Sequence, residues 1–383
     1  MKLVRFSLFI TFFLSCQYAV IIDPVVDCTA EAEDLHEQML HIELTEKQYN
    51  PRCYQLLCNE IVSVVAWQDD KVLVEVPHIY YYGSCRRVLQ GNSFWICKES
   101  ICLLDDIHNA GLEIAKIPPI TQDYTAYHEK VVALVYPFYD PVTQKIYSAG
   151  TRFVLAKEHK KDHFIVYIFD SRDFCFQQTK IPKDHCLLYQ EKDSDQKKDD
   201  FIIILKKWAH LPGGYIPYVW GGSSFCYVLQ EGQNPPDWVA QCGFDCSCLI
   251  SRAAQIAGLP YVFKNSTTLE QCTHPLKQGE PLQKGDIIWF EGHVMVVSDV
   301  EQNLIIEARG YGAGFGRVHE IHISKLFQNM ADFADLLRAY TSKQPLWLLH
   351  ADGTPRVYIK EFKIFSLKQL TSMHFDTWID KKP

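Results

Sequence analysis

The 383-residue sequence has no concentrated run of lysine or arginine, and its 38 basic residues are outnumbered by 46 acidic ones. The net charge of −8 argues against nucleic acid as a partner, because binding to a phosphate backbone depends on clustered positive charge. The sequence also lacks a Cys-x2-Cys pair repeated with histidine at ligand spacing, which argues against a zinc site.

The composition is that of a folded globular protein rather than a disordered one, with 48% apolar and 22% charged residues. Its length leaves room for two or three domains. The fourteen cysteines are many for a cytosolic enzyme and ordinary for an exported one, where several of them can form disulfides, although the pairing cannot be deduced.

The N-terminus has the pattern of an export signal. Lys2 and Arg5 precede an apolar segment, residues 6–14, which is too short to span a bilayer but has the length of a signal-peptide core. We predict a signal peptide over residues 1–19, cleaved near Ala19, and hence a protein of the periplasm or cell envelope. The alternative is lipidation at Cys16, because Leu14-Ser15-Cys16 resembles a lipoprotein cleavage site; this is the one membrane attachment we expect.

Cys246 is a candidate nucleophile at the start of a predicted helix. Asp245 before it is a favourable N-cap, and the following residues have helical apolar spacing and then a helix stop: Leu249, Ala253, Ile256, Ala257, Gly258 and Pro260. Unpaired N–H groups and the positive end of the helix dipole favour a thiolate in the first turn. The alternative is a buried or disulfide-bonded cysteine.

His293 is the candidate general base. It follows a predicted strand, residues 287–290, and a tight Glu291-Gly292 reversal, and it begins a second strand over residues 293–298. A thiol nucleophile needs a nearby imidazole, which forms an ion pair with it and later protonates the leaving amine. Taken alone, His293 could equally be a hydrogen-bonded residue at a strand boundary.

Glu307 is the candidate for the group that orients His293. It lies in the next predicted strand, residues 304–308, and a hairpin that turns about either Val300 or Glu301 brings it to the side of His293. We expect its carboxylate to accept the Nδ1 proton and hold the tautomer. The alternative is a solvated strand residue paired with Arg309.

These segments together resemble the NlpC/P60 family of cell-wall cysteine peptidases. The resemblance rests on order and spacing and covers the chain from near Gly214 to near Ser324, under a third of its length. The matching segments are Ile216-Pro217-Tyr218-Val219-Trp220-Gly221-Gly222, Phe244-Asp245-Cys246-Ser247, Gly285-Asp286-Ile287-Ile288-Trp289-Phe290 and Gly292-His293-Val294. The resemblance implies a papain-like α+β fold with the nucleophile on a helix and the base on a β-sheet.

The chain departs from the family pattern in three places. Cys248 stands where the family usually has glycine, and Glu307 stands where it usually has histidine and sometimes asparagine or glutamine. The stretch from Ser223 to Cys242 looks longer than the family norm, and we expect it to build a wall of the cleft. Cys242 and Cys248 flank the nucleophile and could trap it by oxidation.

The resemblance also implies a substrate site. In relatives that cut after γ-linked D-glutamate, the equivalents of Tyr218, Asp245 and Ser247 line this site. A carboxylate such as Asp245 can bind the free amine of an N-terminal L-Ala, and Ser247 can add a hydrogen bond. The alternatives are that Asp245 only caps the helix and Tyr218 only packs. The backbone N–H of Cys246 would form one half of the oxyanion hole.

The residues before the catalytic segment show short β-like runs that predict two small all-β units. By strand spacing they resemble the paired SH3-like barrels of one branch of the family, in which the first barrel helps to close the substrate site. The charged stretch 191–200 is expected to be a linker and 201–210 the first catalytic helix. The predicted order is signal 1–19, SH3-like domains 27–118 and 119–190, catalytic domain 196–345, and a tail 346–383 without an assigned structure.

The function that this pattern predicts is an exported cysteine peptidase. It would hydrolyse the γ-D-glutamyl–diamino acid bond of peptidoglycan peptides with a free N-terminal L-Ala, and it would need no metal or organic cofactor. Two alternatives are compatible with the same sequence. One is amide or ester hydrolysis or acyl transfer on the same scaffold, and the other is a catalytically silent cell-wall-binding module.

Overall fold

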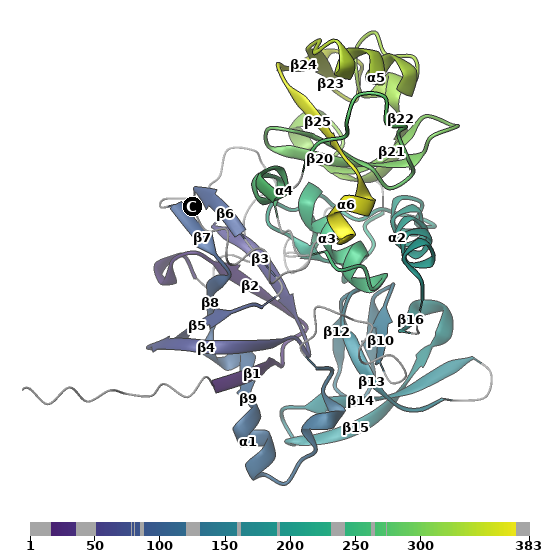
Figure 1. Cartoon of the computed structure of the whole chain (residues 1–383). Coiled ribbons are helices and arrows are strands. Elements are labelled where there is room, and N and C mark those ends of the chain that lie inside the picture. Colours follow the sequence, from purple (N-terminus) through teal and green to yellow (C-terminus); the bar gives the residue numbers. More distant parts are fainter. Residues whose placement is uncertain are drawn as a thin grey trace, which may run out of the picture.

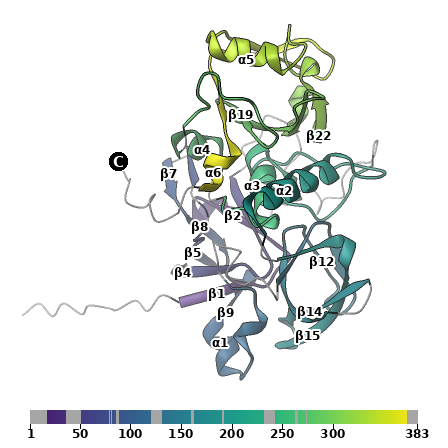
Figure 2. The same ribbon diagram turned by 45° about the vertical axis from the view of Figure 1, so that its right-hand side comes forward.

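The computed structural model of the chain describes residues 17–35, 51–77, 79, 81–84, 88–119, 131–158, 162–189, 192–230, 242–261, 265–272 and 274–372. These residues form three units: a first β unit (residues 17–119), a second β unit (residues 131–189) and an α+β unit (residues 192–372). Figure 1 shows the two β units side by side beneath the α+β unit, and Figure 2 shows the same arrangement from another side.

The first β unit is a seven-stranded antiparallel sheet with the order β3-β2-β8-β5-β4-β1-β9. The same stretch of the chain also contains the β6–β7 hairpin and the short helix α1. The bounds are β1 Gln17–Ile21, β2 Val25–Thr29, β3 Arg52–Leu57, β4 Ile61–Gln68, β5 Lys71–Glu75, β6 Tyr81–Ser84, β7 Val88–Gly91, β8 Ser93–Cys97, β9 Ile101–Leu103 and α1 Leu104–Asn109.

Strand β1 bears on the predicted signal peptide, most of which lies outside the described residues. Ala19 is fully buried in β1, where it pairs with Val62 of β4 and Leu103 of β9. Cleavage near Ala19 would remove half of a strand that joins two neighbours. The predicted leader boundary at residue 19 falls inside β1 and stays a prediction.

The second β unit is a five-stranded antiparallel sheet with the order β15-β14-β13-β10-β16 and a small hairpin, β11–β12. Its own apolar core includes Val132, Phe153 and Val166. The bounds are β10 Val131–Leu134, β11 Phe138–Asp140, β12 Lys145–Tyr147, β13 Arg152–Glu158, β14 His163–Asp170, β15 Cys175–Pro182 and β16 Cys186–Leu188. The two predicted all-β units are thus present as two separate antiparallel sheets.

The α+β unit is built on a five-stranded antiparallel sheet with the order β22-β21-β20-β19-β25. The bounds are α2 Ser194–Ala209, β17 Ser223–Ser224, β18 Gly243–Phe244, α3 Cys246–Ile256, α4 Ser266–Cys272, β19 Ile287–Phe290, β20 His293–Asp299, β21 Leu304–Arg309, β22 Arg317–His322, α5 Phe333–Thr341, β23 Leu346–Leu349, β24 Pro355–Ile359, β25 Phe362–Phe365 and α6 Leu367–Ser372. The predicted α+β class is confirmed for this unit.

Two parts of this unit differ from the expected boundaries. The stretch predicted as a linker is helical from Ser194, because Asp193 caps α2 in a capping box with Gln196. The tail left without an assignment supplies β25, which pairs with β19 at the edge of the central sheet. The sheet that carries His293 and Glu307 therefore extends beyond residue 345.

The central sheet is buried on both faces. Val294 and Val296 of β20 belong to the core that contains α2 and α3, whereas Met295 and Val297 belong to a second core beneath α5. This alternation follows from the two-residue period of a strand. The sheet thus has an apolar run along β20 and separates two cores.

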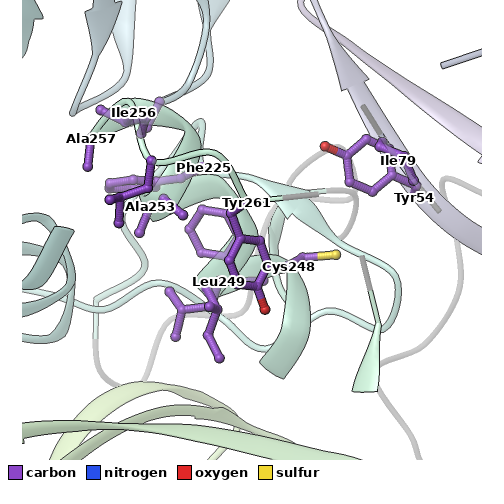
Figure 3. Close-up of a cluster of buried hydrophobic side chains, with 14 of the residues drawn as sticks. Tyr54, Ile79, Phe225, Cys248, Leu249, Ala253, Ile256, Ala257 and Tyr261 are labelled. Atoms are coloured by element: carbon purple, nitrogen blue, oxygen red, sulfur yellow. The ribbon is translucent and has the colours of Figure 1, made fainter. Parts of the chain in front are cut away.

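Helix α3 shares its core with the first β unit. Figure 3 shows Cys248 and Leu249 of α3 beside Tyr261, with Tyr54 and Ile79 of the first β unit on the same side as the Cys248 sulfur. Cys248 is fully buried. The residue that stands where the family usually has glycine is therefore a packed core side chain.

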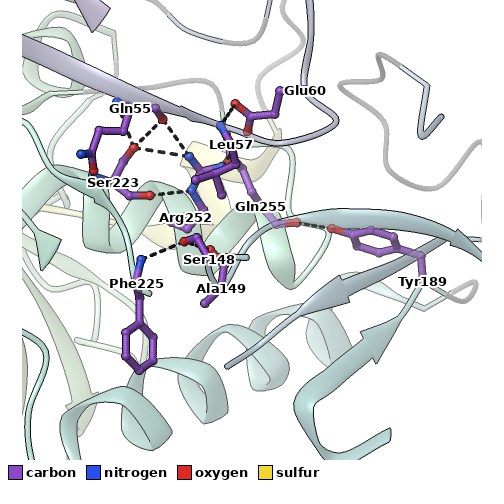
Figure 4. Close-up of polar contacts among 10 residues, drawn as sticks. All are labelled: Gln55, Leu57, Glu60, Ser148, Ala149, Tyr189, Ser223, Phe225, Arg252 and Gln255. Carbon is purple, nitrogen blue, oxygen red and sulfur yellow. Dashed lines mark hydrogen bonds and ion pairs between the residues drawn. The ribbon is translucent and has the colours of Figure 1, made fainter. Parts of the chain in front are cut away.

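Polar contacts also join the first β unit to α3. Arg252 of α3 is 1% exposed, and its guanidinium donates to Glu60 Oε1 at 2.8 Å and to the backbone carbonyl of Gln55 at 3.1 Å (Figure 4). The same guanidinium donates to the carbonyl of Ser223 at 3.0 Å. The second β unit is tied to the helix as well, because Tyr189 donates its hydroxyl to the Gln255 carbonyl at 2.9 Å.

We predict that Glu60→Gln destabilises the protein. The substitution leaves the buried charge of Arg252 without its anion and should lower the free energy of unfolding by about 3 kcal/mol. Chemical denaturation followed by circular dichroism measures this. Glu99→Gln, at an exposed position, is the control and should change stability by less than about 0.5 kcal/mol. Equal stability of the two variants would contradict the prediction.

Candidate active site

Cys246 is the first residue of α3. The short strand β18, paired with β17, leads directly into Asp245, which has extended backbone angles and caps the helix. Its Oδ1 accepts the N–H of Cys248 at 2.6 Å and the hydroxyl of Ser247 at 2.9 Å. The N–H of Cys246 has no acceptor within the helix, so it remains at the positive end of the helix dipole beside the thiol.

His293 is placed by a tight hairpin between β19 and β20. Phe290 pairs with His293 across the turn, and Gly292 has a φ of 82°, a conformation that glycine adopts without strain. A side-chain hydrogen bond joins His293 to Cys246. The structure therefore brings the candidate nucleophile and the candidate base into contact.

Glu307 contacts the other side of His293. The Nε2–H group of His293 donates to Glu307 Oε2 at 2.6 Å. The expectation that Glu307 would bind Nδ1 is wrong, because the carboxylate lies against Nε2. Nδ1 is then the ring nitrogen left for Cys246.

The strand register explains how Glu307 reaches the histidine. Val296 pairs with Ile306 and Val297 with Ile305, and an irregularity follows before Asp299 pairs with Leu304. Continuing this ladder places Met295 opposite Glu307. Glu307 is thus diagonal to His293, which corresponds to the second of the two hairpin registers.

The environment of His293 favours its charged form. Burial disfavours the imidazolium, but the Cys246 thiolate and the hydrogen bonds to Cys246 and Glu307 outweigh burial and raise the pKa of His293 to about 9. A histidine that stays protonated through neutral pH can pair with a thiolate. The structure therefore places a histidine with a raised pKa against Cys246 on one side and Glu307 on the other.

Glu307 is an anion in a fully buried position. Burial opposes its charge, but hydrogen bonds from His293 and His319 and the charge of Arg309 hold the pKa of this carboxyl well below its usual range. Arg309 Nη1 lies 3.5 Å from Glu307 Oε1. The interpretation of Glu307 as a solvated strand residue is thus wrong, because the side chain is 1% exposed, whereas the suggested pairing with Arg309 is present.

Two of the three candidate substrate-binding residues, Asp245 and Ser247, flank the nucleophile in sequence, and the third, Tyr218, pairs with Phe244 two residues before it. Asp245 and Ser247 are buried and hydrogen-bonded to each other in the helix cap. Tyr218 is half-buried, its backbone N–H donates to Gly316 O at 2.9 Å, and its ring lies close to Gly310. Tyr218 is therefore held between the strand that enters α3 and the loop after β21.

The cysteines that flank the nucleophile have other surroundings. Cys242 and Cys226 are both buried, and their side chains hydrogen-bond to each other. Cys248 lies in the core. Cys226, Cys242 and Cys246 are free thiols. Residues 231–241 of the expected cleft wall lie outside the described residues.

Sequence reasoning missed His319, which contacts Glu307 from strand β22. Its Nε2 is 3.2 Å from Glu307 Oε1. The alternation Arg317-Val318-His319 signals a strand, with Val318 buried and His319 on the other face. The glycine-rich segment before it, residues 310–316, hides the hairpin register, so the contact could not be assigned from the sequence.

Two further findings concern metal binding and membrane spans in the residues that the structure describes. Within the described ranges, no group of three or more His, Cys, Asp and Glu side chains has a geometry that could hold a metal ion. No helix in those ranges is both long and apolar enough to cross a membrane.

Comparison with known proteins identifies the fold. No protein-family model and no curated protein matches the sequence. The structure is similar to an NlpC/P60 family protein from Bacillus cereus ATCC 10987, with a TM-score of 0.53 and 18% identity over 82% of this chain and 95% of that chain. The chain thus has the fold of an NlpC/P60 family protein over most of its length.

Two other solved structures are more distant. NlpC2 from Trichomonas vaginalis has a TM-score of 0.32 and 14% identity, covering 81% of this chain and 94% of its own. The peptidoglycan hydrolase RipB from Mycobacterium tuberculosis has a TM-score of 0.24 and 24% identity, covering 34% of this chain and 62% of its own.

We predict that Glu307→Gln lowers the pH at which the Cys246–His293 pair is lost. The carboxylate raises the pKa of His293, so a neutral amide at this position lowers that pKa. His293 then loses its proton below pH 9, and the alkaline limb of the pH profile of Cys246 reactivity moves toward neutrality. The rate of catalysis should fall by about 10²-fold. The pH dependence of Cys246 alkylation by iodoacetate measures the limb, because the imidazolium attracts this anionic reagent to the thiolate.

Glu320→Gln is the matched control for this prediction. Glu320 lies on β22 of the same sheet, but its carboxylate contacts Ser298 and His210 rather than His293. This variant should keep the parental limb. An unchanged limb in Glu307→Gln would show that Glu307 does not set the charge of His293.

Proposed function

We propose that this chain is an exported cysteine peptidase of the NlpC/P60 family that acts on cell-wall peptides. The observation that carries the proposal is the contact series Cys246, His293 and Glu307, with the cysteine at a helix N-terminus and the carboxylate buried. This is the arrangement that thiol-dependent acyl transfer needs: a nucleophile, a base and a group that orients the base. The fold shared with the Bacillus cereus protein supports the same family.

The reaction proceeds through a thioester. The Cys246 thiolate attacks the carbonyl carbon of the scissile amide, and the N–H of Cys246 donates to the developing oxyanion. His293 gives its Nδ1 proton to the leaving nitrogen, and the amine departs. His293 then takes a proton from water, whose oxygen attacks the thioester, and the carboxylic acid leaves as Cys246 is regenerated.

The substrate we propose is a peptidoglycan peptide with a free N-terminal L-Ala, cut at the γ-D-glutamyl–diamino acid bond. The support is the family resemblance of Tyr218, Asp245 and Ser247, which lie around the start of α3. Asp245 Oδ1 serves the helix cap, and a carboxylate can accept further hydrogen bonds from an ammonium group. Capping and amine binding are therefore compatible.

We further propose that the two β units are SH3-like barrels and that the first one borders the substrate site. In support, the first β unit shares a core with α3 and binds Arg252 through Glu60. Hairpin strand β6 also contacts α4. Export to the periplasm or cell envelope is supported by the basic and then apolar N-terminal sequence, residues 1–16.

The experiment that tests the function uses the mature protein and L-Ala-γ-D-Glu-diaminopimelate, with products identified by mass spectrometry. We predict release of diaminopimelate by the parent and none by Cys246→Ala. Cys248→Ala is the matched control, because it removes a thiol from the same helix turn and should retain activity. No cleavage by the parent, or equal cleavage by Cys246→Ala, would reject the peptidase; transfer to an added amine would indicate an acyltransferase instead.

We predict that Asp245→Asn separates the two roles of Asp245. Asparagine is an equally good N-cap, so α3 should keep its start, but the charge that binds an ammonium is lost. The value of kcat/KM for the free-amine peptide should fall by about 10- to 100-fold, the effect of one hydrogen bond to a charged group. The value of kcat/KM for an N-acetylated peptide should not fall in this way. An equal fall for both peptides would show that Asp245 only caps the helix.

A further inference from the structure

His319 gives Glu307 a second hydrogen-bond donor. The two residues are direct partners across the β21–β22 ladder. Glu307 Oε2 accepts from His293, whereas Glu307 Oε1 lies 3.2 Å from His319 Nε2. A carboxylate can only accept hydrogen bonds, so both histidines present an N–H group to it.

The ring of His319 is itself held by packing. Phe315 stacks on it with ring centroids 4.5 Å apart and an interplanar angle of 20°. The Arg309 guanidinium lies 5.0 Å from the centre of the Phe315 ring and donates from Nη2 to Leu349 O at 2.6 Å. These contacts restrain His319 and Arg309, the two residues beside Glu307 Oε1.

The loop that carries Phe315 needs two unusual backbone angles. Gly314 has a φ of 80° and Gly316 a φ of 64°, values that residues with a Cβ rarely adopt. A Cβ on Gly316 would also lie 2.4 Å from the Tyr311 ring. The loop is therefore shaped to fold Phe315 back over His319.

We propose that His319 is a positioning residue that acts on His293 through Glu307, so that the catalytic series is Cys246, His293, Glu307 and His319. The inference rests on the proposed thiol chemistry. The terminal torsion of a glutamate is soft, and a single hydrogen bond leaves the carboxylate free to rotate. A donor on Oε1 holds Oε2 in line with His293 Nε2, and such outer partners of an acting group influence activity strongly.

Arg309 does not replace His319 in this role. Its Nη1 is 3.5 Å from Glu307 Oε1, beyond the usual hydrogen-bond length, and its Nη2 is already bound to Leu349 O. Arg309 stabilises the negative charge of the Glu307 carboxylate, whereas His319 fixes the orientation of that carboxylate. The distinction makes the role of His319 testable with neutral side chains.

The test uses a pair of isosteric variants of the full-length mature chain. The amide nitrogen of glutamine can occupy the place of His319 Nε2, whereas that of asparagine reaches only the place of Nδ1. The readout is the rate at which iodoacetamide alkylates Cys246, measured by peptide mass spectrometry at about pH 6.5, where an ordinary thiol is protonated. This readout requires no substrate.

We expect His319→Asn to slow Cys246 alkylation by about tenfold and His319→Gln to stay within about threefold of the parent. His322→Gln is the control, because His322 lies on the same strand but contacts Ser324 instead of Glu307. It should react at the parental rate. Thermal unfolding of all three variants confirms that folded proteins are compared, and His319→Leu replaces His319→Asn if the latter does not fold.

The outcomes separate this inference from the proposed function. Parental reactivity in His319→Asn, or an equal loss in His319→Asn and His319→Gln, overturns the positioning role while leaving Cys246 and His293 intact. If Cys246 of the parent reacts no faster than N-acetylcysteine, the proposed nucleophile itself fails. Slow alkylation of Cys246 in His319→Asn together with near-parental alkylation in His319→Gln supports the positioning role of His319.

Discussion

Helix α3 is buried along its whole length, and this burial dictates how the units around it assemble. All eleven of its residues are buried, including polar ones such as Ser251, Arg252 and Gln255. Buried polar groups must find hydrogen-bond partners, and a buried guanidinium needs an anion. The partners of Arg252 include Glu60 of the first β unit and the Ser223 carbonyl, so the helix that starts with Cys246 can pack only when these parts are assembled around it.

A second cluster of buried charges surrounds Glu307 in the central sheet. Glu307 is held as an anion by His293, His319 and Arg309, and its charge keeps His293 protonated. Arg252 and Glu60 stabilise the position of the helix, whereas Glu307 and its neighbours set the protonation state beside the helix N-terminus. Structure and chemistry thus rely on the same physical rule, that a charge away from water needs a charged or hydrogen-bonding partner.

Much of the α+β unit could be predicted from local patterns. The predicted strands 287–290, 293–298 and 304–308 match β19, β20 and β21 to within one residue, because apolar strands bounded by turn residues have a clear signal. The first turns of α2 were missed, since a charged stretch without an apolar face looks like a linker unless the Asp193–Gln196 capping box is recognised. Strand β25 was missed because its partner, β19, is distant in sequence.

Local sequence patterns are enough to predict the start of α3, the cysteine placed there and the hairpin that begins with His293, because caps, helical spacing and turn residues act over a few neighbouring positions. Long-range packing is needed to establish which ring nitrogen meets Glu307, that Glu307 is buried and that His319 binds its other oxygen. These features depend on strand register and on exclusion of water, and both are set by packing between segments far apart in the chain.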